Sequence, residues 1–306
     1  MGVKVFAPAS VGNCIVGFDT LGLALERPGD EVIVKKTDRK GLRITKITGA
    51  KGKLPYEIEK NTAGKAALSV LKHLGAEDMG IDMEIHKKMP FGSGLGSSAA
   101  SAVAGAFAIN ILLKSPIEKR KLLPFALDGE ELASGSRHAD NVAPSLIGGI
   151  ILSRSESDVH RILAPKGLIA TVIYPHIKIL TKDARNILSD TVPLKKMVEQ
   201  SSNLASFIIA CFNSDYDLLT RCMEDVVIEP QRAKLIPHFQ EVKAAALDQG
   251  ALGCSISGAG PSIFALSANT LIAENTASAM QKVFSDNKIE SEVFMSGINH
   301  EGAVLY

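Results

Sequence analysis

Residues 90–101, Pro-Phe-Gly-Ser-Gly-Leu-Gly-Ser-Ser-Ala-Ala-Ser, carry three glycines at alternate positions, followed by two serines and an alanine-rich run. Glycine lets a backbone approach an anion closely because it has no Cβ, and the first amides of a helix carry a partial positive charge. Residues 81–86 alternate apolar and polar side chains as a half-buried strand does, and residues 97–113 are small and apolar as in a buried helix. The segment therefore predicts a strand, a phosphate-binding loop and a helix, with a nucleotide as the ligand.

The loop differs from the two commoner glycine-rich phosphate loops. A Walker loop requires a Gly-Lys pair before its final Ser or Thr, and residues 92–98 contain no lysine. A dinucleotide-binding fingerprint requires a third glycine at position 97, where this chain has serine. Glycine-rich turns between a strand and a helix often only allow close packing, so the loop alone leaves both interpretations open. Two further motifs favour phosphate binding.

The length and charge of the chain limit the possible partners. A chain of 306 residues is about twice as long as a usual single domain, so we expect two domains. The charged and polar run at 153–160 marks the expected boundary, which divides the chain into residues 1–160 and 161–306. The 34 basic residues nearly balance the 33 acidic ones, which argues against nucleic acid or an anionic membrane as a partner. A small molecule is the expected partner.

Cysteine usage and the chain start indicate the compartment. The cysteines are Cys14, Cys211, Cys222 and Cys254. They are too few and too scattered for a disulfide framework, and none forms a Cys-x-x-Cys pair. Since no apolar signal core follows Met1 either, we expect a cytoplasmic protein. The uncharged run at 89–113 is long enough to span a bilayer, but it opens with proline and glycines, so we expect a helix buried in protein instead.

Hydrophobic periodicity predicts further elements along the chain. Strands are expected at residues 3–7, 31–36, 81–86, 146–153, 168–174 and 262–267. Helices are expected at residues 61–74, 97–113, 118–134, 183–188, 198–211 and 235–249. The predicted fold class is α+β, with an antiparallel sheet in the second half.

Two more motifs accompany the glycine-rich loop. One spans residues 7–19, Ala-Pro-Ala-Ser-Val-Gly-Asn-Cys-Ile-Val-Gly-Phe-Asp, and the other spans residues 253–261, Gly-Cys-Ser-Ile-Ser-Gly-Ala-Gly-Pro. With the loop, they resemble the three motifs of the GHMP kinases, in the same order and at similar separations. Residues 138–144, His-Ala-Asp-Asn-Val-Ala-Pro, and 229–232, Glu-Pro-Gln-Arg, resemble more narrowly the branch of that family that phosphorylates L-homoserine. The resemblance extends over essentially the whole chain.

The resemblance implies an enzyme that moves the γ-phosphoryl group of ATP, with Mg²⁺, onto the side-chain hydroxyl of L-homoserine in threonine biosynthesis. It implies the two-domain GHMP kinase fold. The N-terminal ATP-binding domain would be like the second domain of ribosomal protein S5, and the C-terminal domain would be ferredoxin-like. The resemblance also implies a homodimer.

Phosphoryl transfer requires the donor to be held still and its charge to be neutralised. Amides of the glycine-rich loop would hold the phosphates. The residues assigned to it are Pro90, Gly92, Ser93, Gly94, Leu95, Gly96, Ser97 and Ser98. The Ser98 hydroxyl would bind Mg²⁺ or a phosphate oxygen, although a serine at a helix start is also a plain cap.

The remaining nucleotide and metal residues are assigned from the resemblance. Glu130 matches the acidic residue that binds Mg²⁺ in the family, and a carboxylate suits this hard cation, but the neighbouring Glu131 leaves the choice open. By composition alone, glutamates in a helix are mostly solvated. Asn61, Thr62 and Lys87 are expected to line the adenine and ribose pocket, with helix-cap and strand-edge roles as the alternative.

Homoserine is a zwitterion, so its pocket needs a carboxylate for the ammonium group and guanidinium groups for the carboxylate. The resemblance assigns Asp19 to the ammonium group, and Arg185 and Arg232 to the carboxylate. The other substrate-binding residues it assigns are Asn13, His138 and Gly258. Taken singly, arginines of this kind are more often surface residues and a histidine is more often structural.

The catalytic residues assigned are Asn141, Asp140 and Thr181. Asn141 occupies the position of a base in other family members, yet an amide cannot remove a proton. We therefore expect Asn141, Mg²⁺, the helix dipole and Thr181 to stabilise the transition state, with Asp140 as the candidate if a base acts. Ser10 stands where other family members carry a lysine motif, which is a further departure.

Three rival functions remain open at this point. The chain could be another small-molecule kinase of the family, acting on mevalonate or on a sugar. It could be a ligand-binding member without catalysis, although Ser98 and Glu130 are both present. RNA binding is disfavoured by the balanced charge and by the lack of a basic, aromatic-rich stripe.

Overall fold

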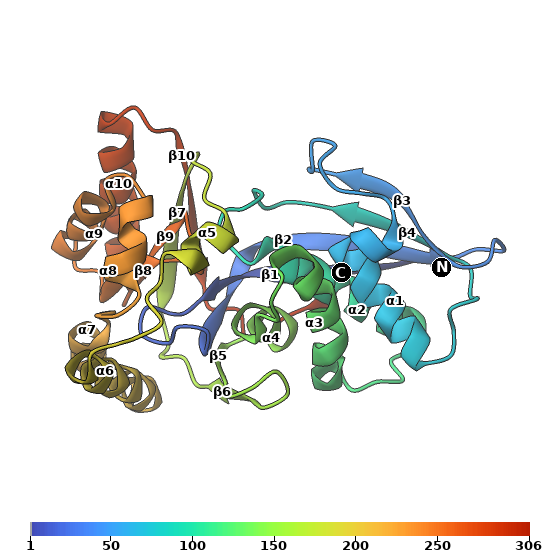
Figure 1. Cartoon of the computed structure of the whole chain (residues 1–306), viewed down its shortest axis with the longest axis horizontal. Helices are drawn as coiled ribbons and strands as arrows, with labels where there is room; N and C mark the ends of the chain where they lie inside the picture. Colours follow the sequence, from blue (N-terminus) through green and yellow to red (C-terminus); the bar gives the residue numbers. More distant parts are fainter. Residues whose placement is uncertain (1) are drawn as a thin grey trace.

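The computed structural model describes residues 2–306, with the backbone alone for Ser134. Its strands are β1 (Gly2–Gly12), β2 (Leu21–Lys36), β3 (Leu42–Thr48), β4 (Ile81–His86), β5 (Ile150–Ser153), β6 (Val159–Ile162), β7 (Ile169–Pro175), β8 (Gly253–Ile256), β9 (Ile263–Ser267), β10 (Ser291–Gly297) and β11 (Val304–Leu305). Its α-helices are α1 (Thr62–His73), α2 (Ser97–Leu112), α3 (Leu123–Ser134), α4 (Ala139–Ile147), α5 (Thr181–Asn186), α6 (Leu194–Asn213), α7 (Tyr216–Cys222), α8 (Glu229–Arg232), α9 (Phe239–Asp248) and α10 (Thr270–Asp286). Short 3₁₀ helices are η1 (Ile58–Lys60), η2 (Lys119–Leu122) and η3 (Ala233–Leu235). The two halves of the chain lie end to end along the long axis (Figure 1).

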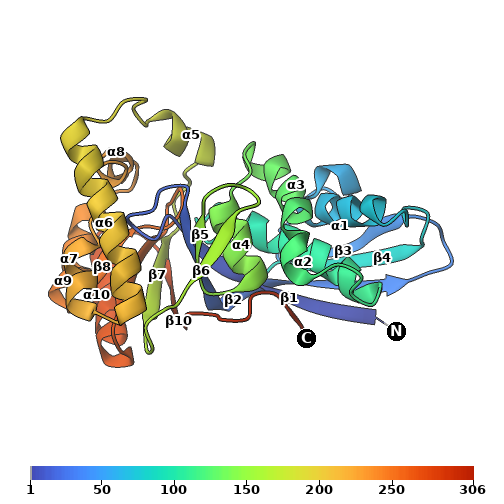
Figure 2. The same ribbon diagram turned by 90° about the horizontal axis from the view of Figure 1, so that it is seen from below.

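The first half is built on a seven-stranded sheet with the path β11-β1-β2-β4-β3, which β5 joins by pairing with β2 and with β6. β1 and β2 pair antiparallel, with Val5 opposite Val32, whereas β3 lies parallel to β4. Helices α1 to α4 cover one face of this sheet (Figure 2). Ile81, Met83 and Ile85 of β4 are buried and alternate with half-buried residues, which confirms the strand predicted there.

Helix α2 occupies the interior of the first half and confirms the predicted buried helix. Nearly all of its residues are buried, against β1, β2, α1 and α3. Small side chains permit this approach, since a Cβ on Gly105 would lie 2.2 Å from the carbonyl oxygen of Ala63 in α1. From Ala99 to Asn110, the uncharged run is thus part of the protein interior. Throughout residues 2–306, we find no helix with the length and apolar character needed to cross a membrane.

The second half contains a four-stranded antiparallel sheet in the order β10-β7-β9-β8. Along the chain, these four strands follow one another as β7, β8, β9 and β10. Helices precede β8 and follow β9, so the half has the β-α-β-β-α-β arrangement of a ferredoxin-like fold. This arrangement and the strands β7 and β9 confirm the α+β prediction for this part of the chain.

Several predicted elements differ from those in the structure. The strand expected at 146–153 is the end of α4 followed by β5, because the chain turns at Gly148 and Gly149, whose φ angles are +73° and +84°. β1 and β2 are longer than expected, because neither residues 8–12 of β1 nor residues 21–30 of β2 alternate regularly in polarity, so no strand was predicted there. The sequence analysis missed β3, β6, β8, β10, β11, α7, α8, α10 and most of α4.

The expected domain boundary after residue 160 falls within β6, which pairs with β5 in the first sheet. The last residues also belong to that sheet, because β11 pairs with β1. We therefore propose to draw the boundary after Ile162 and to group the C-terminal residues with the first domain.

Candidate active site

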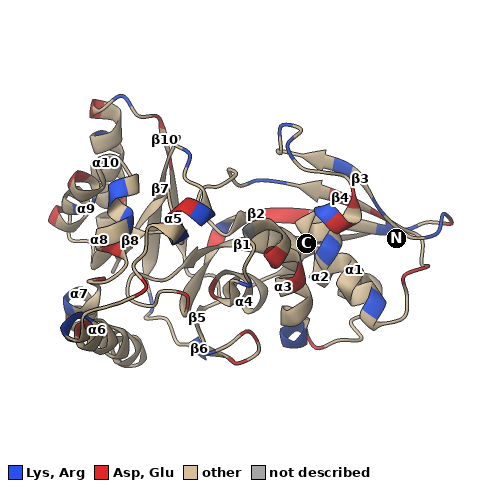
Figure 3. Cartoon of the chain, viewed as in Figure 1, with Lys and Arg blue, Asp and Glu red and all other residues tan. Residues whose placement is uncertain are grey.

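A cavity of about 330 Å³ lies where the glycine-rich loop, α3, α4, α5 and α8 meet. Residues from both halves of the chain line it, and they include all of the site residues assigned above except Asn61, Pro90 and Leu95. In Figure 3, part of the α3 ribbon is coloured for acidic residues, and the α5 ribbon contains residues of both charges. The cavity therefore gathers residues that are far apart in the sequence.

The glycines of the loop are required by close packing at two positions. A Cβ on Gly94, whose φ is +82°, would lie 2.5 Å from the carbonyl oxygen of Ser257. A Cβ on Gly96, whose φ is +63°, would lie 2.1 Å from the Ser10 hydroxyl. Gly92 also has a positive φ, but open space surrounds its Cβ position, and it lines the cavity. The loop thus combines tight packing with an exposed, glycine-lined wall.

The third motif joins the other two. The Ser257 hydroxyl donates to the carbonyl oxygen of Gly94 at 2.6 Å, and the amide of Ser262 donates to the carbonyl oxygen of Ser93 at 3.1 Å. The amide of Gly258 donates to the carbonyl oxygen of Gly12 in the N-terminal motif at 3.3 Å. The three motifs therefore form one continuous wall.

Helix α2 begins at Ser97, with Gly96 as its N-cap in the left-handed conformation. Ser97 and Ser98 are half-buried and line the cavity. The unpaired first amides of a helix and its dipole favour an anion at this end. The start of α2 can therefore hold phosphate oxygens.

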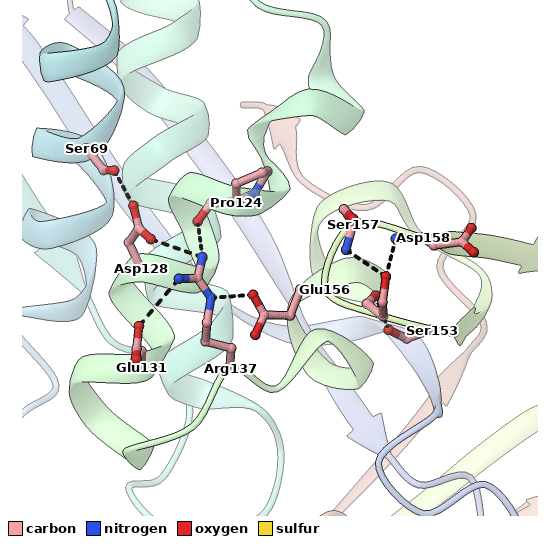
Figure 4. Close-up of polar contacts among 10 residues, drawn as sticks. Ser69, Pro124, Asp128, Glu131, Arg137, Ser153, Glu156, Ser157 and Asp158 are labelled. Atoms are coloured by element: carbon pink, nitrogen blue, oxygen red, sulfur yellow. Dashed lines mark hydrogen bonds and ion pairs between the residues drawn. The ribbon is translucent and has the colours of Figure 1, made fainter.

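The structure distinguishes the two neighbouring glutamates of α3. Glu130 is buried and lines the cavity. Glu131 is exposed and is directed at Arg137, with 3.5 Å between the charged atoms (Figure 4). Arg137 also pairs with Asp128 at 3.1 Å and with Glu156 at 2.8 Å. Only Glu130 is thus in a position to meet a ligand in the cavity.

Oxygen donors suited to a hard cation are present. The carboxylate of Glu130 and the hydroxyl of Ser98 line the same cavity. Such donors fit Mg²⁺, which keeps several waters and shares phosphate oxygens. Within residues 2–306 no group of three or more His, Cys, Asp and Glu side chains gathers as a metal site.

Lys87 lies beneath the loop, with its ammonium group occupied by the protein. It forms an ion pair with Asp30 and donates to the Ser101 hydroxyl at 2.7 Å and to the carbonyl oxygen of Ser97 at 2.8 Å. The Phe91 ring, which lines the cavity, lies 5.6 Å from this ammonium group. Lys87 thus lines the cavity while anchoring the start of α2.

Three assigned residues do not line the cavity. The Asn61 side chain accepts from the amides of Ala63 and Gly64 at 3.1 and 3.3 Å, so it is the N-cap of α1, the structural alternative weighed above. Leu95 is fully buried in the core, because the loop turns its apolar residue inward. Pro90 is half-buried, and its carbonyl oxygen accepts from the Ser93 hydroxyl at 3.0 Å. Thr62, next to Asn61, does line the cavity.

In the part of the cavity lined by Asp19 and Arg185, these two side chains form a two-point ion pair, with nitrogen–oxygen distances of 2.6 and 3.2 Å. Arg232 is almost fully buried and donates to the carbonyl oxygens of Ala184 and Gly258 at 2.9 and 3.1 Å. Asn13 donates to the same Gly258 oxygen at 2.8 Å. Two guanidinium groups, one carboxylate and one amide thus surround this part of the cavity.

Asp140, Asn141 and His138 lie at the start of α4. The Asn141 side chain accepts from the Ser10 hydroxyl at 3.0 Å and donates to Asp140 at 3.3 Å. Burial raises the pKa of the Asp140 carboxyl to about 7, and the negative charge of Asp19 adds to the effect. Burial lowers the pKa of His138, which favours its neutral form. Thr181, at the start of α5, lines the same cavity.

Sequence reasoning missed several lining residues. Phe91 lies within the loop motif, and Ala259 and Gly260 lie within the third motif, so their positions could have been inferred. Ser10 is buried behind the cavity lining and was noted only as a departure, yet its hydroxyl donates to the side chain of Asn141, which does line the cavity. Leu54 comes from the irregular segment before η1, and no pattern in the sequence indicated it.

The chain is similar to known proteins along nearly its whole length. The family model described as GHMP kinases N terminal domain matches residues 61–149, and that described as GHMP kinases C terminal matches residues 207–286. Among curated proteins, the homoserine kinase of Chlorobaculum tepidum is 44% identical over 98% of this chain and 97% of its own length. That of Xylella fastidiosa is 41% identical over 99% of this chain and 93% of its own length.

Solved structures give the same result. A crystal structure of homoserine kinase from Cytophaga hutchinsonii superposes with a TM-score of 0.97 at 51% identity, covering 100% of this chain and 97% of that one. The mevalonate kinase of L. major, solved with R-mevalonate, has a TM-score of 0.74 at 17% identity, covering 96% of each chain, and shares the fold.

Proposed function

The chain belongs to the homoserine kinases of the GHMP kinase family, and from that premise we propose that it transfers the γ-phosphoryl group of ATP to the side-chain hydroxyl of L-homoserine. One observation carries the proposal. A single cavity is lined both by the glycine-rich, helix-capped wall, which we call the donor end, and by Asp19, Arg185 and Arg232, which we call the acceptor end. The first end suits phosphates and the second suits a zwitterion.

At the donor end, loop amides and the start of α2 hold the phosphates of ATP. Glu130 and Ser98 would hold Mg²⁺, which would neutralise phosphate charge and orient the transferred group. Lys87 supports this end indirectly, because its ammonium group binds the Ser97 carbonyl oxygen.

At the acceptor end, binding is an exchange of partners. The substrate ammonium group pairs with Asp19, and the substrate carboxylate takes the place of Asp19 against Arg185 and meets Arg232. Because the Asp19–Arg185 pair is about 40% exposed on each side, opening it costs little. Asn13 and the neutral His138 supply further hydrogen bonds.

Near the reacting hydroxyl, Asn141 orients the oxygen and Asp140 receives its proton. A carboxyl with a pKa of about 7 is matched to proton transfer near neutral pH. The Ser10 hydroxyl holds the Asn141 oxygen, which leaves its amide group to donate. Thr181 adds a hydroxyl to the cavity wall.

The function is tested by measuring ADP release with Mg²⁺ and ATP over a panel of alcohols. L-homoserine should exceed mevalonate and galactose by at least about tenfold in kcat/KM, because buried polar groups reject acceptors that leave them unpaired. Equal or better use of mevalonate or galactose would overturn the proposal. The homodimer implied by the resemblance stays a prediction, which sedimentation equilibrium can test.

A further inference from the structure

Phe18 contacts both arginines of the acceptor end. Its ring centre lies 5.2 Å from the guanidinium carbon of Arg185 and 4.9 Å from that of Arg232. Phe18 comes from the segment between β1 and β2 in the first half, whereas the arginines come from α5 and α8 in the second half. One ring therefore bridges the two halves at the point where two positive charges meet.

The two positively charged guanidinium groups repel each other. Burial lowers the pKa of Arg232, and the charge of Arg185 lowers it further. Arg185 has a carboxylate partner in Asp19, whereas the hydrogen bonds that the structure gives to Arg232 go to the carbonyl oxygens of Ala184 and Gly258. The face of an aromatic ring is negative and attracts cations within about 6 Å. Phe18 thus offers both groups a favourable contact.

Phe18 is not a core residue in the ordinary sense. It is half-buried, and in the described part of the chain it belongs to neither of the two buried hydrophobic clusters. Phe18 also lines a second cavity, of about 730 Å³, together with Val16, Leu204 and Val227. Its contribution to the core is therefore small, and its placement against the arginines needs another reason.

We propose that Phe18 is a positioning residue that holds Arg185 and Arg232 side by side for the substrate carboxylate, and that it thereby selects amino acids over alcohols that lack this group. The inference rests on the proposed function. When the substrate ammonium group engages Asp19, Arg185 loses its present partner. The ring contact remains, so the two arginines stay together while the carboxylate binds.

The test replaces the ring by an aliphatic side chain, Phe18→Leu, with Phe18→Met as a second, unbranched variant. The acceptors are L-homoserine and 3-aminopropan-1-ol, which keeps the ammonium and hydroxyl groups but lacks the carboxylate. We expect the KM for L-homoserine to rise roughly 3- to 30-fold in both variants, with kcat and the KM for ATP nearly unchanged. For 3-aminopropan-1-ol, kcat/KM, or the inhibition constant where turnover is too slow, should not change.

Two controls complete the design. Phe18→Tyr keeps an aromatic face and should restore the wild-type KM, and Phe212→Leu removes an exposed ring of α6 and should change nothing. A wild-type KM in Phe18→Leu, or an equal loss for both acceptors, would overturn the proposal.

Calorimetric binding of L-homoserine separates this proposal from the proposed function. If the wild type binds L-homoserine without phosphorylating it, the proposed function fails, and the affinity of Phe18→Leu still tests the role of Phe18. If the wild type does not bind L-homoserine at all, both proposals are overturned.

Discussion

At the scale of single residues, the acceptor end is already paired within the protein. Asp19 and Arg185 neutralise each other, and Arg232 donates to the carbonyl oxygens of Ala184 and Gly258. A zwitterion can replace one ion pair by two of its own, so binding changes the partners of these groups and leaves their charge balance intact. The loss of binding free energy on removing one of these charges can therefore be estimated from the hydrogen bond that the charge makes to the substrate.

Asp19→Asn should raise the KM for L-homoserine by roughly one to two decades, because a charge-assisted hydrogen bond is worth about 1.5–3 kcal/mol. The KM for ATP should stay close to wild type. Steady-state titration of each substrate with the other saturating measures both constants. An unchanged KM for L-homoserine would dismiss Asp19 as the ammonium partner.

Asp140 should give the pH–rate profile an acidic limb near pH 7. Its carboxyl must be deprotonated to accept a proton, so kcat should fall as pH drops through the raised pKa of about 7. Asp140→Asn should be slow and should lack this limb. A wild-type profile that is flat between pH 6 and 8 would contradict the assignment of Asp140 as the base.

The raised pKa of Asp140 also affects the stability of the fold. This effect favours low pH, whereas the effect on kcat favours high pH. Because the folded pKa of Asp140 exceeds the usual 3.8, the folded chain binds more protons than the unfolded chain between pH 3.8 and about 7. The contribution of Asp140 to the free energy of unfolding is therefore greatest at low pH and is lost as pH rises through that window.

At the scale of elements, α2 and α3 place their side chains at the donor end through helix geometry. The start of α2 presents Ser98, and one face of α3 presents Glu130, while the next residue, Glu131, is turned toward Arg137 (Figure 4). Consecutive residues of a helix point about 100° apart, so only one of the two glutamates can face the cavity. This difference provides a matched pair for mutation.

Glu130→Gln and Ser98→Ala should each raise the Mg²⁺ concentration needed for half-maximal rate, on the order of tenfold, with partial recovery of Glu130→Gln at high Mg²⁺. Glu131→Gln, the matched control, should keep the wild-type requirement. The measurement is turnover against free Mg²⁺ at fixed ATP. Near wild-type rates of both variants at limiting Mg²⁺ would refute the metal assignment.

The glycine-rich loop gives a second matched pair. Gly94→Ala combines a positive φ with a Cβ 2.5 Å from the Ser257 carbonyl oxygen, whereas Gly41→Ala has a similar φ of +84° and open space. Gly41→Ala should cost about 1–2 kcal/mol, and Gly94→Ala should cost more and also raise the KM for ATP. Urea unfolding and ATP titration measure both. Equal stability of the two variants would contradict this prediction, because it would show that the loop moves to accommodate the added Cβ at position 94.

At the scale of the whole molecule, the cavity exists only where the two halves meet. The loop, α3 and α4 belong to the first half, and α5, α8 and the third motif belong to the second (Figure 1). A ligand that contacts both halves binds only the assembled chain. Its binding energy is therefore added to the stability of the folded protein.

L-homoserine at about 100 times its dissociation constant should raise the free energy of unfolding by about 2.7 kcal/mol. Thermal unfolding with and without the ligand measures the shift, and mevalonate at the same concentration is the control. A shift of equal size with mevalonate would contradict a site built for an amino acid.

The sequence by itself determined the local elements with strong patterns and the identity of the motifs. Alternation defined β4, the run of small residues defined α2, and the glycine spacing defined the loop, because each signal depends on neighbours along the chain. Three motifs in one order then indicated the family, which the comparisons confirm. Weaker patterns failed at α4, where no helix was predicted and the last two residues, 146 and 147, were assigned to the strand that follows as β5.

The tertiary structure alone decided which side chains share a site. Asp19 and Arg185 are 166 positions apart in the chain yet form an ion pair, and no local pattern encodes such a contact. The structure likewise showed that Asn61 caps α1 and that Glu130, but not Glu131, lines the cavity. It also showed that the Phe18 ring contacts two arginines. Distances across a fold depend on how whole elements pack, and packing is set by the summed burial of many residues, which a short stretch of sequence does not contain.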